Sequence, residues 1–137
     1  PLLAMLHIAF LWLPVGMLLF AIQGILFTVT GNYFLGKAPV HAIGIGFITS
    51  MTLAMAARVS FGHSGRPLIA SRLTLTCFGL LQLVALIRII GEFPLPGTDM
   101  TGHWILTAAI VWVIALSVWA WTYVPIYLRP RIDGQPG

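Results

Sequence analysis

Four long apolar segments, separated by short polar linkers, dominate the pattern of this chain. They run from about residue 2 to 29, 40 to 60, 71 to 90 and 103 to 123. A helix needs about 20 apolar residues to span a bilayer, so each segment is long enough. The linkers are rich in glycine and proline and short, which makes consecutive helices antiparallel neighbours. The pattern therefore predicts an all-α membrane protein, folded as a single antiparallel bundle of four transmembrane helices.

The composition indicates that lipid is the main solvent of this chain. Of its 137 residues, 59% are apolar and 7% are charged, and the mean hydropathy is +1.00. A soluble domain carries about 25% charged residues. The formal net charge is +4, but the basic residues flank the apolar segments. We therefore attribute them to membrane topology and expect the lipid bilayer, not nucleic acid, as the partner.

The distribution of basic residues predicts the orientation of the bundle. The side with the N-terminus, the second linker and the C-terminus carries five of them, whereas the other side carries Lys37 and Arg88. Lysine and arginine collect on the cytoplasmic side, so both termini are predicted to be cytoplasmic. On the opposite side, Arg88 is expected to pair with Glu92, four residues further on. The five residues on the predicted cytoplasmic side are Arg58, Arg66, Arg72, Arg129 and Arg131.

One face of the second segment carries a stripe of small side chains. Gly46, Ser50 and Ala54 recur every four residues. In lipid, small residues at this spacing let another helix approach closely. We expect the stripe to pack against a neighbouring helix, and contact with spans outside this chain or with a second copy of it is the alternative.

A different face of the same segment carries histidine and methionine. His41, Met51, Thr52 and Met55 fall within a sector of about 100° on a helical projection. Histidine and methionine are both ligands of haem iron. The simpler interpretation is that the methionines fill irregular gaps in packing.

Four histidines lie near the ends of the segments. His7 and His63 belong to the side that holds the N-terminus, whereas His41 and His103 open the second and fourth segments on the other side. His41 and His63 are 22 residues apart, about 33 Å along a helix, so they cannot ligate one metal within the chain. The pairs that remain are His7 with His63 and His41 with His103. Each histidine alone also has a simpler interpretation, as a solvated or hydrogen-bonded side chain at a helix end.

The turn after the second segment reads GHSGRP and places His63 and Arg66 beside two glycines. Such a turn gathers backbone N–H groups near a guanidinium. This arrangement suits an anion such as a phosphate, a haem propionate or a lipid headgroup. A basic loop that binds no ligand is the alternative interpretation.

Gln82 lies near the centre of the third segment and is expected to form a hydrogen bond between helices. An aqueous path lined by Gln82, in a transporter or channel half, is one alternative function. A purely structural or oligomerising helix module is another. The segments hold no carboxylate, and the HExxH, CxxC and GxSxG motifs are absent, so no independent catalytic site is visible.

Two stretches of the chain resemble the NnrS family. One is RVSFGHSGRPL at residues 58–68, and the other is the start His41-Ala42 with the methionine-rich run that follows at residues 51–55. NnrS proteins are integral membrane proteins that contain haem and copper and are associated with the response to nitric oxide. The resemblance covers nearly the whole chain. It implies a multi-pass protein of the bacterial inner membrane, and the chain resembles the C-terminal third of longer family members.

The resemblance also implies a role in nitric-oxide stress or denitrification, with haem or copper as cofactor. His41 is then the first candidate for an axial ligand of haem, with Met55 or His103 as the second. His7 joins His41 as a candidate metal ligand. The side chains expected to hold the haem propionates are Arg58, Arg66 and, in support, His63.

Overall fold

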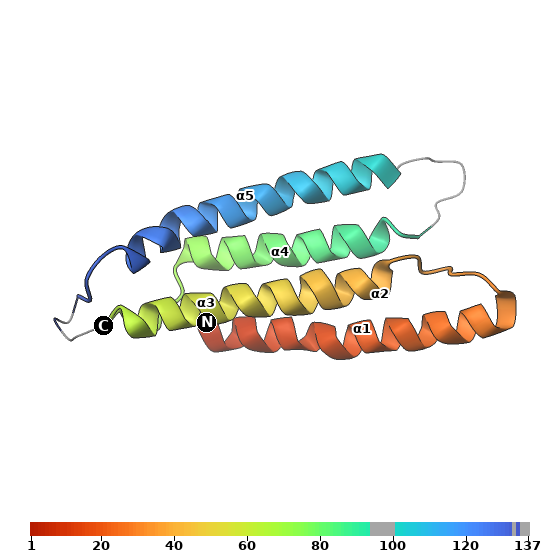
Figure 1. Ribbon diagram of the computed structural model, residues 1–137, viewed down its shortest axis with the longest axis horizontal. Helices are drawn as coiled ribbons and strands as arrows, with labels where there is room; N and C mark the ends of the chain where they lie inside the picture. Colours follow the sequence, from red (N-terminus) through yellow and green to blue (C-terminus); the bar gives the residue numbers. More distant parts are fainter. Residues whose placement is uncertain (94–100, 133, 135–137) are drawn as a thin grey trace.

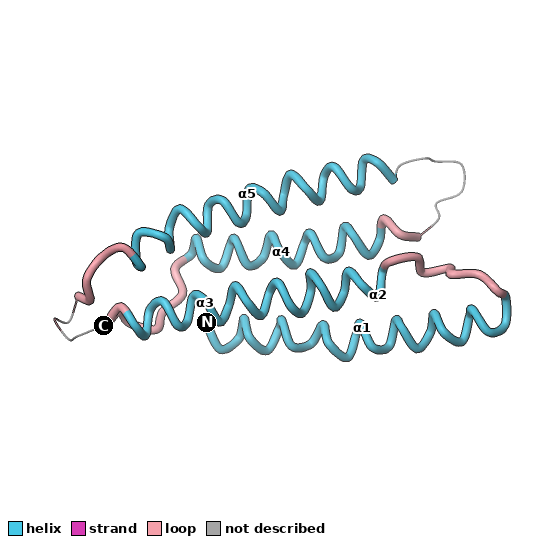
Figure 2. The backbone as a smooth tube through the Cα atoms, viewed as in Figure 1, coloured by secondary structure: helices cyan, strands magenta, loops and turns pink. Residues whose placement is uncertain are grey.

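All regular elements in the part of the chain that the structure describes are helices (Figure 1, Figure 2). The computed structural model describes residues 1–93, 101–132 and 134. In chain order the elements are α1 Leu2–Thr30, α2 Ala38–His41, the π-helix η1 Ala42–Thr49, α3 Ser50–His63, α4 Arg72–Ile90 and α5 Thr101–Tyr127. Since α2, η1 and α3 form one continuous helix, four helices are long and apolar enough to cross a membrane. The prediction of an all-α membrane bundle is confirmed.

The observed helices run a few residues past the predicted segments. The second begins at Ala38 and ends at His63, and α5 continues through Pro125 to Tyr127. Local sequence features explain where several of the helices begin or end. Gly31 ends α1 in the left-handed region, with φ 70°, where most other side chains are strained. Ser71 caps the start of α4, because its hydroxyl accepts a hydrogen bond from the Thr74 N–H at 3.1 Å.

The helices lie side by side in the order α1, α3, α4, α5, so α3 and α4 are central (Figure 1). α1 packs against η1 and α3, α5 packs against α4, and a smaller contact joins α3 to α5. In the most apolar 18-residue window of each helix, 44% of α4 is buried but only 11% of α5. The outer helices therefore present long apolar faces outward, as lipid-facing helices do.

The two ends of the bundle differ in the elements that they hold. The N-terminus and the end of α5 lie at one end, together with the end of α3 (Figure 1). We call this the termini end, and the end where α2 begins the opposite end. A large apolar cluster packs the four helices together and includes Met5, Leu53, Phe78, Leu81 and Tyr123. A smaller cluster joins η1, α4 and α5 through Ile45, Val84, Ala85 and Ala108.

The π-helix η1 is the main departure from the regular helix that the sequence predicts. Two hydroxyl side chains stabilise its wide turns, since each donates to a carbonyl five residues back. Thr49 Oγ1 donates to the Gly44 carbonyl at 2.9 Å, and Ser50 Oγ donates to the Ile45 carbonyl at 3.2 Å. π segments are rare and occur frequently at functional sites.

We predict that Gly46→Ala destabilises the chain and that Gly44→Ala, in the same π-helix, does not. A Cβ at Gly46 would lie 2.4 Å from Cδ2 of Trp12, whereas nothing lies within 4 Å of a Cβ at Gly44. Overpacking of this kind costs about 1–3 kcal/mol of unfolding free energy. Unfolding in mixed detergent micelles measures the loss, and equal stabilities of the two variants would contradict the packing of α1 on η1.

Candidate functional site

A cluster of charged side chains at the opposite end of the bundle surrounds His41. The Nε2 atom of His41 lies 2.9 Å from Nη2 of Arg88 and 3.2 Å from Oε1 of Glu92. Arg88 and Glu92 also form an ion pair, at 3.2 Å, as the sequence predicts. The second carboxylate oxygen of Glu92 accepts a hydrogen bond from the Lys37 N–H at 2.8 Å. The cluster therefore fastens the start of the second span to the end of α4.

The chemistry of these groups keeps Nε2 of His41 engaged in either protonation state. A guanidinium only donates hydrogen bonds, and an ionised carboxylate only accepts them. An unprotonated Nε2 therefore accepts from Arg88, whereas a protonated Nε2 donates to Glu92. Ligation of a metal through this nitrogen would displace both contacts.

Glu92 lies just beyond the end of α4, and its surroundings shift its pKa. Burial alone raises the pKa of this carboxyl. Hydrogen bonds from the Lys37 N–H and from His41, together with the charges of His41 and Arg88, outweigh burial and lower the pKa below its ordinary value. Glu92 is therefore an ionised carboxylate in the folded chain. Gly36 leaves room for this side chain, because a Cβ at residue 36 would lie 2.5 Å from Oε2 of Glu92.

A second polar network crosses the middle of the bundle. The Trp12 indole N–H donates to Oε1 of Gln82 at 2.7 Å, and Nε2 of Gln82 donates to Ser50 Oγ at 2.8 Å. Ser50 in turn donates to the Ile45 carbonyl inside η1. The expected interhelical hydrogen bond of Gln82 is confirmed. Because its amide oxygen and nitrogen both bind neighbouring helices, Gln82 serves here as a contact between helices.

The stripe of small residues on the second span lies inside the chain. Gly46, Ser50 and Ala54 are all buried, and the Trp12 side chain covers Gly46. The predicted packing against neighbouring helices is confirmed, with α1 on Gly46 and α4 on Ser50. The stripe has no exposed surface left for a second copy of the chain.

His7 lies on the outward side of α1, close to methionines of α3. Its Nδ1 lies 2.8 Å from the Leu3 carbonyl, which assigns the ring proton to that nitrogen and leaves Nε2 as an acceptor. His7 and Met51 line one cavity of about 370 Å³, together with Leu6 and Phe10. The antiparallel register that places Trp12 on Gly46 sets His7 opposite Met51.

Two more predicted residues share that face of α3. Met55 and Arg58 follow Met51 by four and seven residues, which are the spacings of side chains on one face of a helix. Both are exposed. The structure thus gathers His7, Met51, Met55 and Arg58 on the outward side of α1 and α3, in the half nearer the termini end.

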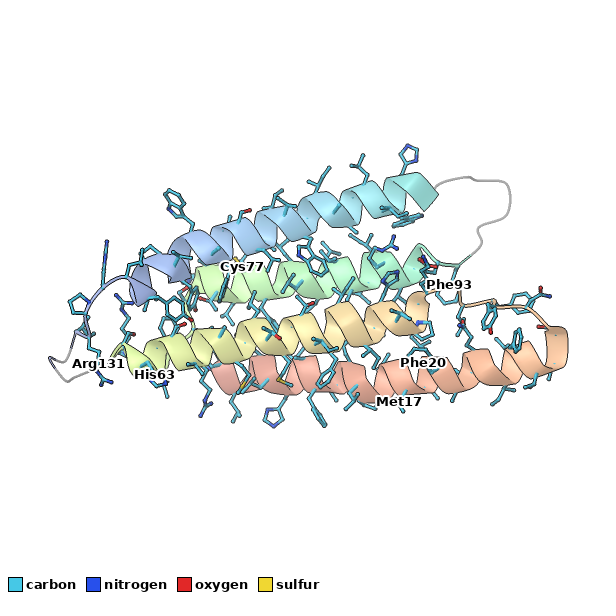
Figure 3. The ribbon with its side chains drawn as sticks, viewed as in Figure 1. Met17, Phe20, His63, Cys77, Phe93 and Arg131 are labelled. Carbon is cyan, nitrogen blue, oxygen red and sulfur yellow. The ribbon has the colours of Figure 1, made fainter. Side chains whose placement is uncertain are left out.

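The turn GHSGRP is a Schellman motif that ends α3. The Arg66 N–H donates to the Phe61 carbonyl at 3.0 Å, and the Gly65 N–H donates to the Gly62 carbonyl at 3.5 Å. Gly65 has φ 72°, which explains the second glycine of the turn. The side chain of His63 is exposed at the termini end (Figure 3).

Several predicted partners of His41 lie far from it. Met55 is 14 residues along the same helix, about 20 Å away, and Arg58 lies a further turn on. Axial ligands of one haem flank a single iron atom, so the structure does not bring His41 and Met55 together for that role. His103 is exposed at the start of α5. Among the described residues, no group of three or more His, Cys, Asp or Glu side chains could hold a metal ion.

Sequence reasoning missed a group of hydroxyls at the termini end. Ser60 and Tyr127 share a short hydrogen bond between α3 and α5, and Thr74 Oγ1 lies 2.9 Å from the Tyr123 hydroxyl. Tyr123 also stacks on Trp119, with ring centroids 4.7 Å apart. The signal for this group in the sequence is a pair of tyrosines four residues apart near the end of a span. This spacing does not identify the residues to which the tyrosines form hydrogen bonds.

Long apolar helices joined by polar contacts define a multi-pass α-helical membrane protein. Comparison with protein families identifies the family of this chain. A family model described as NnrS protein matches residues 1–131, nearly the whole chain. The chain therefore belongs to the NnrS protein family, as the resemblance of its motifs implied. No curated protein and no solved structure gives a significant match.

We predict that the charged cluster loses its stabilising effect in acid. Because the folded-state pKa of Glu92 is lowered, its contribution is fully present above the ordinary glutamate pKa of about 4.3 and is lost as the pH falls through the folded-state value. Thermal unfolding between about pH 3 and pH 7 measures this loss. Glu92→Gln should unfold more easily near neutrality and converge with the wild type in acid, and parallel curves would contradict the role of the cluster.

Proposed function

We propose that this chain serves the response to nitric oxide in a bacterial cytoplasmic membrane and that it contributes ligands to a haem or copper site. Membership of the NnrS family supports the nitric-oxide role. The position of five of the seven basic residues on one side supports an orientation with both termini in the cytoplasm.

The observation that carries the ligand proposal is the geometry of His7. Metal-ligating histidines commonly donate the N–H of one ring nitrogen to a carbonyl or carboxylate, which fixes the ring and leaves the other nitrogen for the metal. The contact of His7 Nδ1 with the Leu3 carbonyl is of this kind. Nε2 of His7 is therefore the proposed ligand atom.

The surroundings of His7 suit a haem or a copper ion. Imidazole and thioether groups ligate haem iron, and they also bind copper, which soft ligands select in its reduced state. Met51 lines the same cavity as His7, and Met55 lies one turn further along α3. Arg58 lies on this face too, about 10 Å along the helix from Met51, where its guanidinium can pair with a propionate.

Each residue has a defined task in this proposal. His7 and a methionine would hold the metal, Leu6 and Phe10 line the same cavity, and the carbonyl of Leu3 fixes the imidazole ring. The bound metal would supply an open coordination position for nitric oxide. His41 is the less favourable candidate, because Arg88 and Glu92 already engage its Nε2.

The open side of this face suggests where further spans would pack. His7, Met55 and Arg58 are all exposed on the chain by itself. We therefore propose that the remaining spans of the parent protein, or a second chain, cover the outward side of α1 and α3.

We predict that His7→Ala weakens haem or copper binding by about 10-fold or more, on the scale of losses seen when a metal site is disturbed. The haem measurement is a titration of the detergent-purified chain followed by visible absorption and by its shift on addition of nitric oxide. Cu(I) binding is measured by competition with a chromogenic Cu(I) chelator. His103→Ala is the matched control, because His103 is also an exposed histidine near a helix end.

Circular dichroism of each variant separates lost binding from lost folding. His7→Met retains a soft ligand and is expected to keep part of the copper affinity. A wild-type chain that binds neither haem nor Cu(I) would refute the ligand proposal. So would binding that is abolished by His41→Ala and unaffected by His7→Ala.

A further inference from the structure

A polar cavity lies at the termini end, between the end of α3 and the segment that follows α5. Its volume is about 290 Å³. Figure 3 shows His63 and Arg131 at this end of the molecule, and both line the cavity. The polar side chains around it are Ser60, His63, Ser64, Tyr127, Arg129 and Arg131.

The chemistry of this lining fits an anion. Two guanidiniums, one imidazole and three hydroxyls surround the cavity, and the described residues that line it include no carboxylate. Guanidinium groups bind phosphate oxygens through paired hydrogen bonds, and an imidazole N–H can donate a further one. We propose that this cavity binds the phosphodiester group of an anionic phospholipid.

The helix end beside the cavity is capped by the backbone. The last turn of α3 is closed by backbone N–H groups, since Ser64 donates to Ser60 at 3.1 Å and Arg66 donates to Phe61 at 3.0 Å. The Ser64 carbonyl accepts from the Ile132 N–H at 3.2 Å. This last bond also holds the segment after α5 against the end of α3 and so closes one side of the cavity.

A neighbouring arginine adds to the positive charge of this region. Nη1 of Arg66, two residues beyond Ser64, is buried and has no hydrogen-bond partner among the described residues. A buried guanidinium nitrogen of this kind is costly unless a further acceptor satisfies it. Because Arg66 does not line the cavity, it adds positive charge to this end of the bundle and no direct contact with the phosphate.

The location of the cavity favours a phospholipid over a soluble anion. It lies where apolar helices end, which is the level of the lipid headgroups. Large apolar side chains of α5 and the residue after it are exposed nearby, with Val124 at 49% and Leu128 at 80%. Acyl chains can cover these side chains while the phosphate enters the cavity. A water molecule occupies about 30 Å³ in the liquid, so the cavity is large enough for a phosphate and adjoining glycerol atoms.

The test compares the thermal unfolding of the full chain in micelles doped with phosphatidylglycerol or phosphatidylcholine. A ligand that binds the folded state raises its stability, so phosphatidylglycerol should raise the Tm of the wild type above the value in phosphatidylcholine. The double variant Arg129→Gln/Arg131→Gln should lose more than about half of that difference. Arg72→Gln, which removes an exposed cation at the same end but outside the cavity, should keep it.

Native mass spectrometry of the same samples counts retained lipids and does not depend on how each variant unfolds. If the double variant fails to fold, His63→Gln replaces it, with the same expected loss. An unchanged Tm difference in the cavity variants, or an equal loss in Arg72→Gln, would overturn the proposal. A full Tm increase with inorganic phosphate alone would also overturn it, because the site would then bind a soluble anion. None of these outcomes depends on haem or copper.

Discussion

The need to satisfy polar groups inside hydrocarbon is the constraint on which this arrangement of helices depends. Lipid offers no hydrogen bonds, so a polar side chain in a span must find its partners on its own helix or on a neighbouring one. Gln82 finds them on two, and its contacts with Trp12 and Ser50 join α1, α4 and the second span at a fixed register. Ser50 extends this network into η1, where its hydroxyl supports a π turn.

Polar contacts also join the helices at both ends of the bundle. These contacts occupy some side chains and leave others available to bind a ligand. His41 is committed to Arg88 and Glu92, a contact that fastens the start of the second span to α4. The hydrogen bond of His7 goes to its own helix, at the Leu3 carbonyl, and the side chain lines an open cavity. The histidine with the stronger sequence argument thus has a structural role, and the less prominent one is the histidine for which we propose a ligand role.

The outward faces of this small bundle carry the chemistry proposed for it. The inner helices use their small and polar side chains to pack. The outward side of α1 and α3 instead carries His7, Met51 and Arg58. At the termini end, arginines and hydroxyls surround a cavity at headgroup level.

The sequence by itself determined the four spans, the pairing of Arg88 with Glu92 and the bonding of Gln82 between helices, because these follow from apolar length and local spacing. The RVSFGHSGRPL block also indicated the family. Only the tertiary structure decided that η1 is a π-helix, that His41 joins the Arg88 pair and that His7 faces Met51. Those features depend on how one helix is rotated and shifted against the next, and side-chain contacts between distant segments set that relation.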